Sequence, residues 1–157
     1  MKTLKRQQPR SCPRLRHPKL KGEWAEIAFM SKAMSLGFTV CRPYGDSHIF
    51  DFLVFTADCK VSRVQVKSCW TKSKGYYPLN THSAYRRRYR PRDIDFVVGY
   101  VVPHDAWYVI PVRKITGTMS ALFPHKPLSR GRYERYRDAW HLLRSQPSQI
   151  AEVRLQK

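Results

Sequence analysis

Two β-prone runs joined by a five-residue loop place the strongest constraint on this fold. The runs cover residues 49–55 and 61–68, and the "TADCK" segment between them has the length of a wide hairpin loop. We therefore expect neighbouring antiparallel strands. Pairing about this loop sets Asp51 opposite Gln65, and directly opposed side chains lie about 5 Å apart.

Side chains alternate along a strand, so Arg63, Gln65 and Lys67 share one face of the second run. Together with Asp51 they bring a carboxylate, an amide oxygen and an ammonium group to one side of the sheet. Mg²⁺ prefers hard oxygen ligands, and a lysine beside it can orient or help deprotonate an attacking water. The alternative is that Gln65 and Lys67 form the solvated face of an amphipathic strand.

The remaining segments predict a mixed α/β domain with the element order α-β-β-β-β-β-α. Apolar residues recur at helical spacing from Gly22 to about Leu36, and Gly37 provides a stop. After a short β-prone segment and the hairpin comes a long polar stretch. An apolar run at 95–102, a "PHDA" turn and a run at 107–112 then predict a second hairpin. In "RYERYRDAWHLLR", Tyr133, Tyr136, Trp140 and Leu143 would fall on one stripe of a helix, which predicts a final helix.

Charge indicates the kind of partner. The chain has 30 Lys and Arg against 11 Asp and Glu, a formal net charge of +19, which favours a polyanion such as DNA or RNA. No run approaches about 18 apolar residues, so we expect no membrane association. The absence of a secretory signal and the scattered cysteines favour a cytoplasmic protein with reduced thiols.

Several segments also resemble a known family: "KGEWAE", "GF", "RPYGDSHIFDFLV", "VQVKS", "DIDFVVGYV", "WYVIPV" and "YERYRDAW". They resemble the PD-(D/E)xK nuclease superfamily, most closely its group I intron-associated endonucleases, over roughly residues 20 to 144. The resemblance implies a restriction-endonuclease-like core, with a central mixed sheet flanked by helices. We expect a basic, flexible arm at 1–20, one nuclease domain at 21–146 and a tail at 147–157.

The resemblance also implies roles at the converging residues. Asp51 takes the place of the central metal-binding acid, Lys67 that of the catalytic lysine, and Glu26 that of the helix carboxylate. Gln65 stands where the second acid is expected, and its neutral amide oxygen should bind Mg²⁺ more weakly than a glutamate. Asp51, Gln65 and Glu26 are therefore the predicted ligands of Mg²⁺ or Mn²⁺.

Two other acids have simpler explanations. Glu23, one turn before Glu26, could assist with charge or pair with a nearby cation. Asp46 follows a glycine, as a turn-forming aspartate does.

The stretch "SAYRRRYRPRD" interleaves arginines with tyrosines, which can contact phosphates and stack on bases. A solvated loop is the alternative. The predicted DNA-binding residues are Arg86, Arg87, Arg88, Arg90, Lys72 and Lys74.

The resulting functional hypothesis is a metal-dependent homing endonuclease that cuts double-stranded DNA at an intron-insertion site. One active site per chain requires at least a dimer, so a homodimer or homotetramer is expected. Two alternatives stay open: a nucleic-acid-binding protein with a catalytically relict nuclease fold, and a restriction-like or junction-resolving nuclease.

Overall fold

The computed structural model describes residues 15–45, 47–83, 87–125 and 131–145. These ranges contain two α-helices, seven strands and three short 3₁₀ helices. The α-helices and strands are α1 (Pro18–Ser35), β1 (Thr39–Cys41), β2 (Phe52–Phe55), β3 (Val61–Cys69), β4 (Tyr77–Asn80), β5 (Phe96–Val101), β6 (Ala106–Pro111), β7 (Met119–Leu122) and α2 (Leu142–Ser145). The 3₁₀ helices are η1 (Val102–His104), η2 (Val112–Lys114) and η4 (Glu134–Tyr136).

The central sheet has the strand order β1-β2-β3-β5-β6. Only the β3–β5 pair is parallel, and the other neighbours in this sheet are antiparallel, so the predicted mixed sheet is confirmed. The β2–β3 hairpin pairs Phe52 with Val64 and Phe55 with Val61, which is the register predicted from the loop length. The second predicted hairpin is β5–β6.

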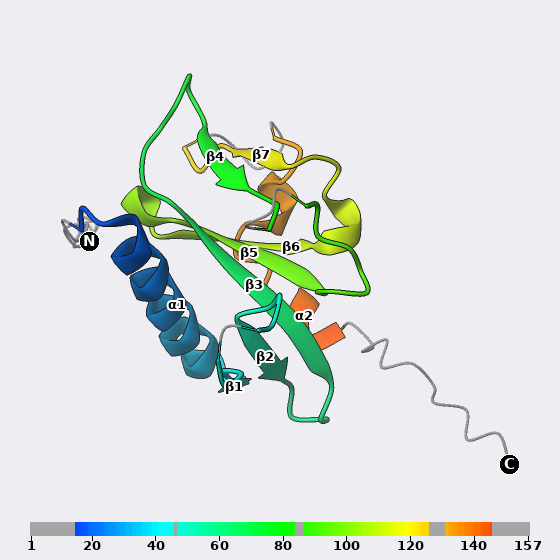
Figure 1. Cartoon of the computed structure of the whole chain (residues 1–157). Helices are drawn as coiled ribbons and strands as arrows, with labels where there is room; N and C mark the ends of the chain where they lie inside the picture. The colour runs from blue at the N-terminus through cyan, green and yellow to red at the C-terminus, as the bar shows by residue number, and fades with distance from the viewer. Residues whose placement is uncertain (1–14, 46, 84–86, 126–130, 146–157) are drawn as a thin grey trace, which may run out of the picture.

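The sheet lies between two different layers (Figure 1). On one face, Ala25, Phe29 and Ala33 of α1 share a hydrophobic core with Val64 and Val66 of β3. On the other face, β4 and β7 form a two-stranded sheet that packs over β5 and β6. Because side chains alternate along β3, Arg63, Gln65 and Lys67 project away from the core shared with α1.

Close packing between the sheet layers depends on Gly99 in β5. A Cβ atom built at Gly99 would lie 2.8 Å from Cδ2 of Leu79 in β4. A side chain there would displace the buried Leu79 side chain, so glycine at this position leaves room for Leu79 between the two sheets.

Some predicted boundaries were wrong. The first helix begins at Pro18 rather than Gly22, because proline suits the first turn of a helix and Lys19 pairs with Glu23 one turn later, at 4.0 Å. Residues 18–20 are therefore helical and not part of an arm. The predicted strand at 49–55 is a strand only from Phe52. The segment expected to be polar loop contains β4, which pairs with β7, a strand that was also not predicted.

The predicted final helix is largely absent. The segment instead contains η4, a backbone bridge from Arg137 to Tyr108 of β6, and the four-residue α2. Asp138 has a left-handed backbone with φ of 51°, which ends any helix at that point, and its N–H donates to the carbonyl of Trp107 at 2.6 Å. Attachment to β6 therefore replaces continuous helical hydrogen bonding.

Part of the predicted organisation falls outside the described residues: most of the basic arm, the tail at 147–157, Asp46 and Arg86. Within the described ranges, no helix is both long and apolar enough to cross a membrane.

Candidate active site

Asp51 is fixed where β2 separates from β3. The paired register ends at Phe52 and Val64, and one residue before Phe52 the Asp51 N–H donates to the carbonyl of Val64 at 2.9 Å. The Asp51 carboxylate then accepts two hydrogen bonds on Oδ2, from the Val66 N–H at 2.8 Å and from Gln65 Nε2 at 2.5 Å. The structure therefore brings Asp51 and Gln65 together, as the hairpin register predicts.

Glu26 and Lys67 complete a charged group around Asp51. Burial raises the pKa of the Glu26 carboxyl, and the nearby charge of Asp51 raises it further, while Lys67 acts in the opposite direction. Burial also raises the pKa of Asp51, against the lowering effect of the Val66 N–H and of Lys67. The helix carboxylate and the strand residues are therefore within electrostatic range of one another.

Arg42, which follows β1, is a member of this group that sequence reasoning missed. Its Nη2 lies 3.1 Å from Oε2 of Glu26, and its charge lowers the pKa values of both Glu26 and Asp51. No spacing rule singles out a cation in a loop, so the sequence carries no signal for this contact. Arg42 partly compensates the two carboxylates. Glu23 pairs with Lys19 at 4.0 Å, and its charge also raises the pKa of Glu26, so both interpretations of Glu23 remain compatible with the structure.

The donor set fits a divalent cation. Two partly desolvated carboxylates, each with a raised pKa, are groups whose charge a bound metal would stabilise. The described part of the chain holds no cluster of three His, Cys, Asp or Glu side chains suited to a metal. Further oxygen ligands could come from water, from a backbone carbonyl or from the side-chain amide of Gln65, whose Nε2 bonds to Asp51 in this structure. Asp51, Glu26 and Gln65 are the residues that could hold Mg²⁺ or Mn²⁺.

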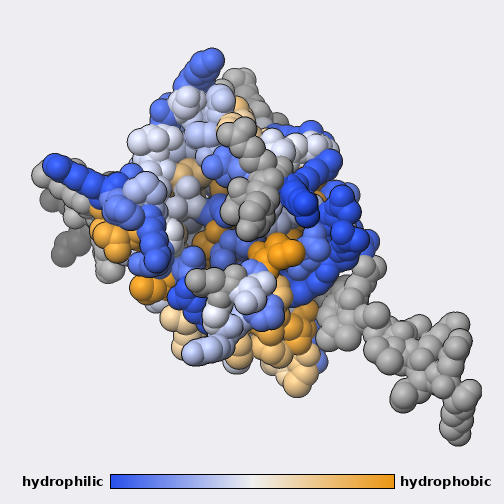
Figure 2. All heavy atoms as spheres, in the orientation of Figure 1, coloured by the Kyte–Doolittle hydropathy of each residue, from blue (hydrophilic) through white to orange (hydrophobic). Residues whose placement is uncertain are grey.

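A cavity of about 780 Å³ opens beside Gln65 and Lys67. Its lining is rich in cations and comes from the loop before β2, from β3 and from the segment before β5. The lining residues are Ser47, His48, Ile49, Gln65, Lys67, Ser83, Arg87, Arg88, Tyr89, Arg90, Arg92 and Asp93. Hydrophilic side chains gather on the right-hand side of the molecule in Figure 2. Figure 1, in the same orientation, places the segment before β5 on that side.

The predicted DNA-binding residues separate into two groups. Arg87, Arg88 and Arg90 line the cavity, although Arg88 also donates to the carbonyl of Ile115. Lys72 and Lys74 are exposed in the turn before β4 and are not among the lining residues. Arg92, from the same predicted stretch "SAYRRRYRPRD", also lines the cavity, although it was not singled out as a DNA-binding residue. His48 lines the cavity but was not predicted, because it lies in a loop where side-chain periodicity gives no orientation.

Comparison with known proteins agrees with this geometry. The profile of the PD-(D/E)XK endonuclease family matches residues 16–143, and the chain belongs to this family.

Among solved structures, the chain is similar to the bacterial homing endonuclease I-Ssp6803I, with 32% sequence identity and a TM-score of 0.71. That match covers 81% of this chain and 93% of the other. A weaker match is Hjc, a Holliday junction resolvase from Archaeoglobus fulgidus, with 19% identity, a TM-score of 0.45 and coverage of 63% and 80%. No curated protein sequence matches the chain significantly.

Proposed function

We propose that this endonuclease is a metal-dependent enzyme that hydrolyses phosphodiester bonds of double-stranded DNA. The observation that carries the proposal is the position of the Asp51–Gln65 pair and Lys67 next to an arginine-lined cavity. A cavity with several arginines suits a polyanion, and the formal charge of +19 suits a long one.

The residues would divide the work as follows. Asp51, Glu26 and Gln65 would hold Mg²⁺ or Mn²⁺, which when bound supplies a Lewis acid for the phosphate and lowers the pKa of water. Lys67 lies on the same face of β3 as Gln65 and within electrostatic range of Asp51, so its ammonium can orient the attacking water and stabilise charge on the phosphate. Arg87 and Arg90, on the cavity wall, would position the DNA backbone.

We further propose a homing role, in which the enzyme makes a double-strand break at one target site. The similarity to a bacterial homing endonuclease over most of both chains supports this role. Because the described residues of each chain form one such site, cutting both strands calls for at least a homodimer. Location of the gene inside a self-splicing intron, together with cleavage of the intron-free site, would test the role. Preference for four-way junctions over linear duplex would favour a junction-resolving nuclease instead.

Plasmid cleavage across a Mg²⁺ titration tests the catalytic assignment. Asp51→Asn removes the central ligand charge and should lower the cleavage rate by at least about 1,000-fold. Lys67→Ala should lower it by about 100-fold or more. Both variants should bind duplex DNA in Ca²⁺ with near wild-type affinity, because the arginine-lined wall is unchanged.

Cleavage by both variants at the wild-type rate would show that these residues are not catalytic. A wild-type protein that binds DNA but does not cut it in Mg²⁺ or Mn²⁺ would identify a relict fold that only binds nucleic acid.

A further inference from the structure

Arg63 lies two residues before Gln65 on the same face of β3, but it faces a different set of groups. Its Nε and Nη2 donate to Asp95 Oδ2 and Oδ1 at 3.0 and 2.9 Å, so the two side chains form a bidentate pair. The Arg63 N–H also donates to Asp95 Oδ2 at 2.8 Å, and the Asp95 N–H donates to the Arg63 carbonyl at 2.9 Å. Asp95 immediately precedes β5, so the pair locks β3 to the start of β5.

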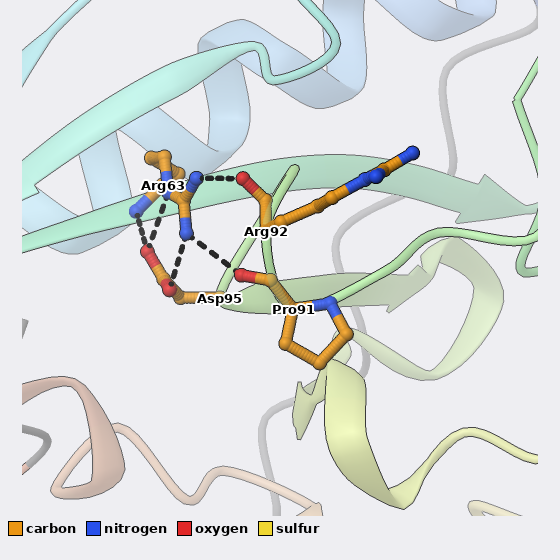
Figure 3. A network of polar contacts seen from close by, with 4 residues as sticks. All are labelled: Arg63, Pro91, Arg92 and Asp95. Carbon is orange, nitrogen blue, oxygen red and sulfur yellow. Dashed lines mark hydrogen bonds and ion pairs between the residues drawn. The ribbon is translucent and has the colours of Figure 1, made fainter. Parts of the chain in front are cut away.

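The same guanidinium also holds the segment before Asp95. Nη2 donates to the carbonyl of Pro91 at 2.9 Å, and Nη1 donates to the carbonyl of Arg92. Figure 3 shows the consequence for Arg92: its carbonyl points at Arg63, whereas its own side chain extends away from Arg63. Arg63 thus fixes the backbone of a turn whose arginine side chains remain available to the cavity.

The turn has few other attachments between its two ends. Tyr89 and Ile94 are buried, with 6% and 0% of their surfaces exposed, and they anchor the ends. Between them, Arg90, Pro91 and Arg92 are exposed, and within this stretch the Asp93 and Ile94 N–H groups bond only back to the Arg90 carbonyl. Among the hydrogen bonds of the described residues, those from Arg63 tie the middle of the turn to the strand that carries Gln65 and Lys67.

We propose that Arg63 and Asp95 form a positioning clamp that holds the cavity wall at 90–93 in place beside the catalytic strand for DNA binding. The inference rests on the proposed function. Arg63 is not a phosphate contact in this arrangement, because Asp95 neutralises its charge and four of its five side-chain N–H donors bond within the protein. Its contribution is preorganisation: a wall already in place does not lose conformational freedom when DNA binds.

An electrostatic role and a positioning role for the pair predict different changes in DNA affinity, which makes the proposal testable. Arg63→Met lowers the net charge by one and Asp95→Asn raises it by one, so a purely electrostatic role would weaken DNA binding in the first variant and strengthen it in the second. A clamp is broken by either change. We expect both variants to bind duplex DNA in Ca²⁺ about tenfold more weakly, with salt dependence close to that of the wild type.

Arg63→Lys keeps the charge and is the conservative variant. A lysine ammonium lacks the planar fork that bonds Asp95 and two carbonyls at once, so this variant should also bind more weakly. The matched control is the exposed Lys60–Asp58 pair in the hairpin loop, at 2.7 Å. Lys60→Met and Asp58→Asn should each change affinity by less than about twofold, in opposite directions.

Amide hydrogen exchange at 87–93 provides a readout that needs no DNA. The clamp predicts faster exchange there in all three variants, measured well below their unfolding temperatures, with exchange in β5 and in β3 beyond Arg63 unchanged. Opposite shifts in affinity for Arg63→Met and Asp95→Asn, or wild-type exchange at 87–93, would overturn the clamp while leaving the nuclease proposal intact. A wild type that fails to bind or cut DNA would refute the proposed function, and exchange alone would then decide whether the clamp exists.

Discussion

At the scale of single residues, the site combines the partly desolvated carboxylates of Asp51 and Glu26 with the neutral side-chain amide of Gln65, at a position where a third carboxylate would add negative charge. The Gln65 amide donates to Asp51 Oδ2, which also accepts a hydrogen bond from the Val66 N–H. Gln65 itself is only 8% exposed. This arrangement keeps Asp51 oriented in the absence of a metal. In the proposed nuclease it would also limit the negative charge that repels DNA, at the cost of weaker attraction for a divalent cation.

Gln65→Glu tests this balance. A third carboxylate should tighten divalent-ion binding by about tenfold, because one more negative charge contacts the metal. It also removes the amide N–H that bonds Asp51 and places two carboxylates side by side. We therefore expect half-maximal cleavage at a lower Mg²⁺ concentration but a maximal rate no higher than that of the wild type. Unchanged Mg²⁺ dependence would place Gln65 outside the metal site.

The raised pKa of Asp51 predicts a stability effect that depends on pH. A carboxyl whose pKa is higher in the folded than in the unfolded protein holds its proton more tightly when folded. Its ionisation therefore reduces stability as the pH rises from the ordinary carboxyl pKa through the raised value. In EDTA at neutral pH, Asp51→Asn should be more stable than the wild type by about 1 kcal/mol.

This difference should shrink as the pH falls through the raised pKa and should be lost below the ordinary aspartate pKa of about 3.9, where the wild-type carboxyl is protonated in both states. Urea unfolding of the two proteins across this pH range measures the effect. Saturating Mg²⁺ should stabilise the wild type more than the variant. An EDTA difference that is constant with pH would mean that charge at Asp51 does not limit stability.

At the scale of secondary-structure elements, the sequence was most informative where contacts are local. The β2–β3 register followed from alternation and a five-residue loop, and it placed Asp51 against Gln65 correctly. Contacts between distant segments were missed. β4 and β7 are only four residues each, and Tyr77 meets Leu122 across 45 positions of sequence. Short strands of this kind have no periodicity strong enough to recognise alone.

The prediction of a helix in the C-terminal segment was wrong for a related reason. Its aromatic spacing imitates a helix, but Glu134 is fully buried and its carboxylate accepts hydrogen bonds from the Tyr108 hydroxyl at 2.9 Å and the Phe123 N–H at 2.8 Å. Arg137 Nη1 lies 3.7 Å from the same carboxylate. The tertiary contacts of the buried Glu134 therefore override the helical spacing of the aromatic residues. The sequence alone does not show which acid will be buried.

Glu134→Gln tests the importance of this network for the fold. Glutamine has nearly the same size but only one acceptor oxygen and no charge for Arg137, so part of the network is left unsatisfied in the core. We expect a loss of about 2–4 kcal/mol in the free energy of unfolding, measured in urea. Glu23→Gln, at an exposed ion pair on α1, is the control and should cost less than about 1 kcal/mol. A loss no larger than that of the control would show that η4 is held by other contacts.

At the scale of the whole molecule, the net charge of +19 and the arginine-lined cavity lead to a prediction about salt. Each phosphate that a cation neutralises releases counterions, and the slope of log K against log salt falls by about 0.9 for each contact that is removed. Arg87 and Arg90 are exposed on the cavity wall, whereas Arg88 also bonds the Ile115 carbonyl and Arg63 is committed to Asp95. Arg87→Ala combined with Arg90→Ala should therefore reduce the slope by about 2 per protomer.

Duplex binding in Ca²⁺ between 50 and 300 mM salt, roughly the range over which such contacts change affinity most, measures this slope. Lys60→Ala removes an exposed cation in the hairpin loop and serves as the control, since Lys60 does not line the cavity. Its slope should match that of the wild type. If the double variant keeps the wild-type slope and Lys60→Ala lowers it, the DNA lies along the hairpin end of the sheet and the cavity is not where the backbone is held.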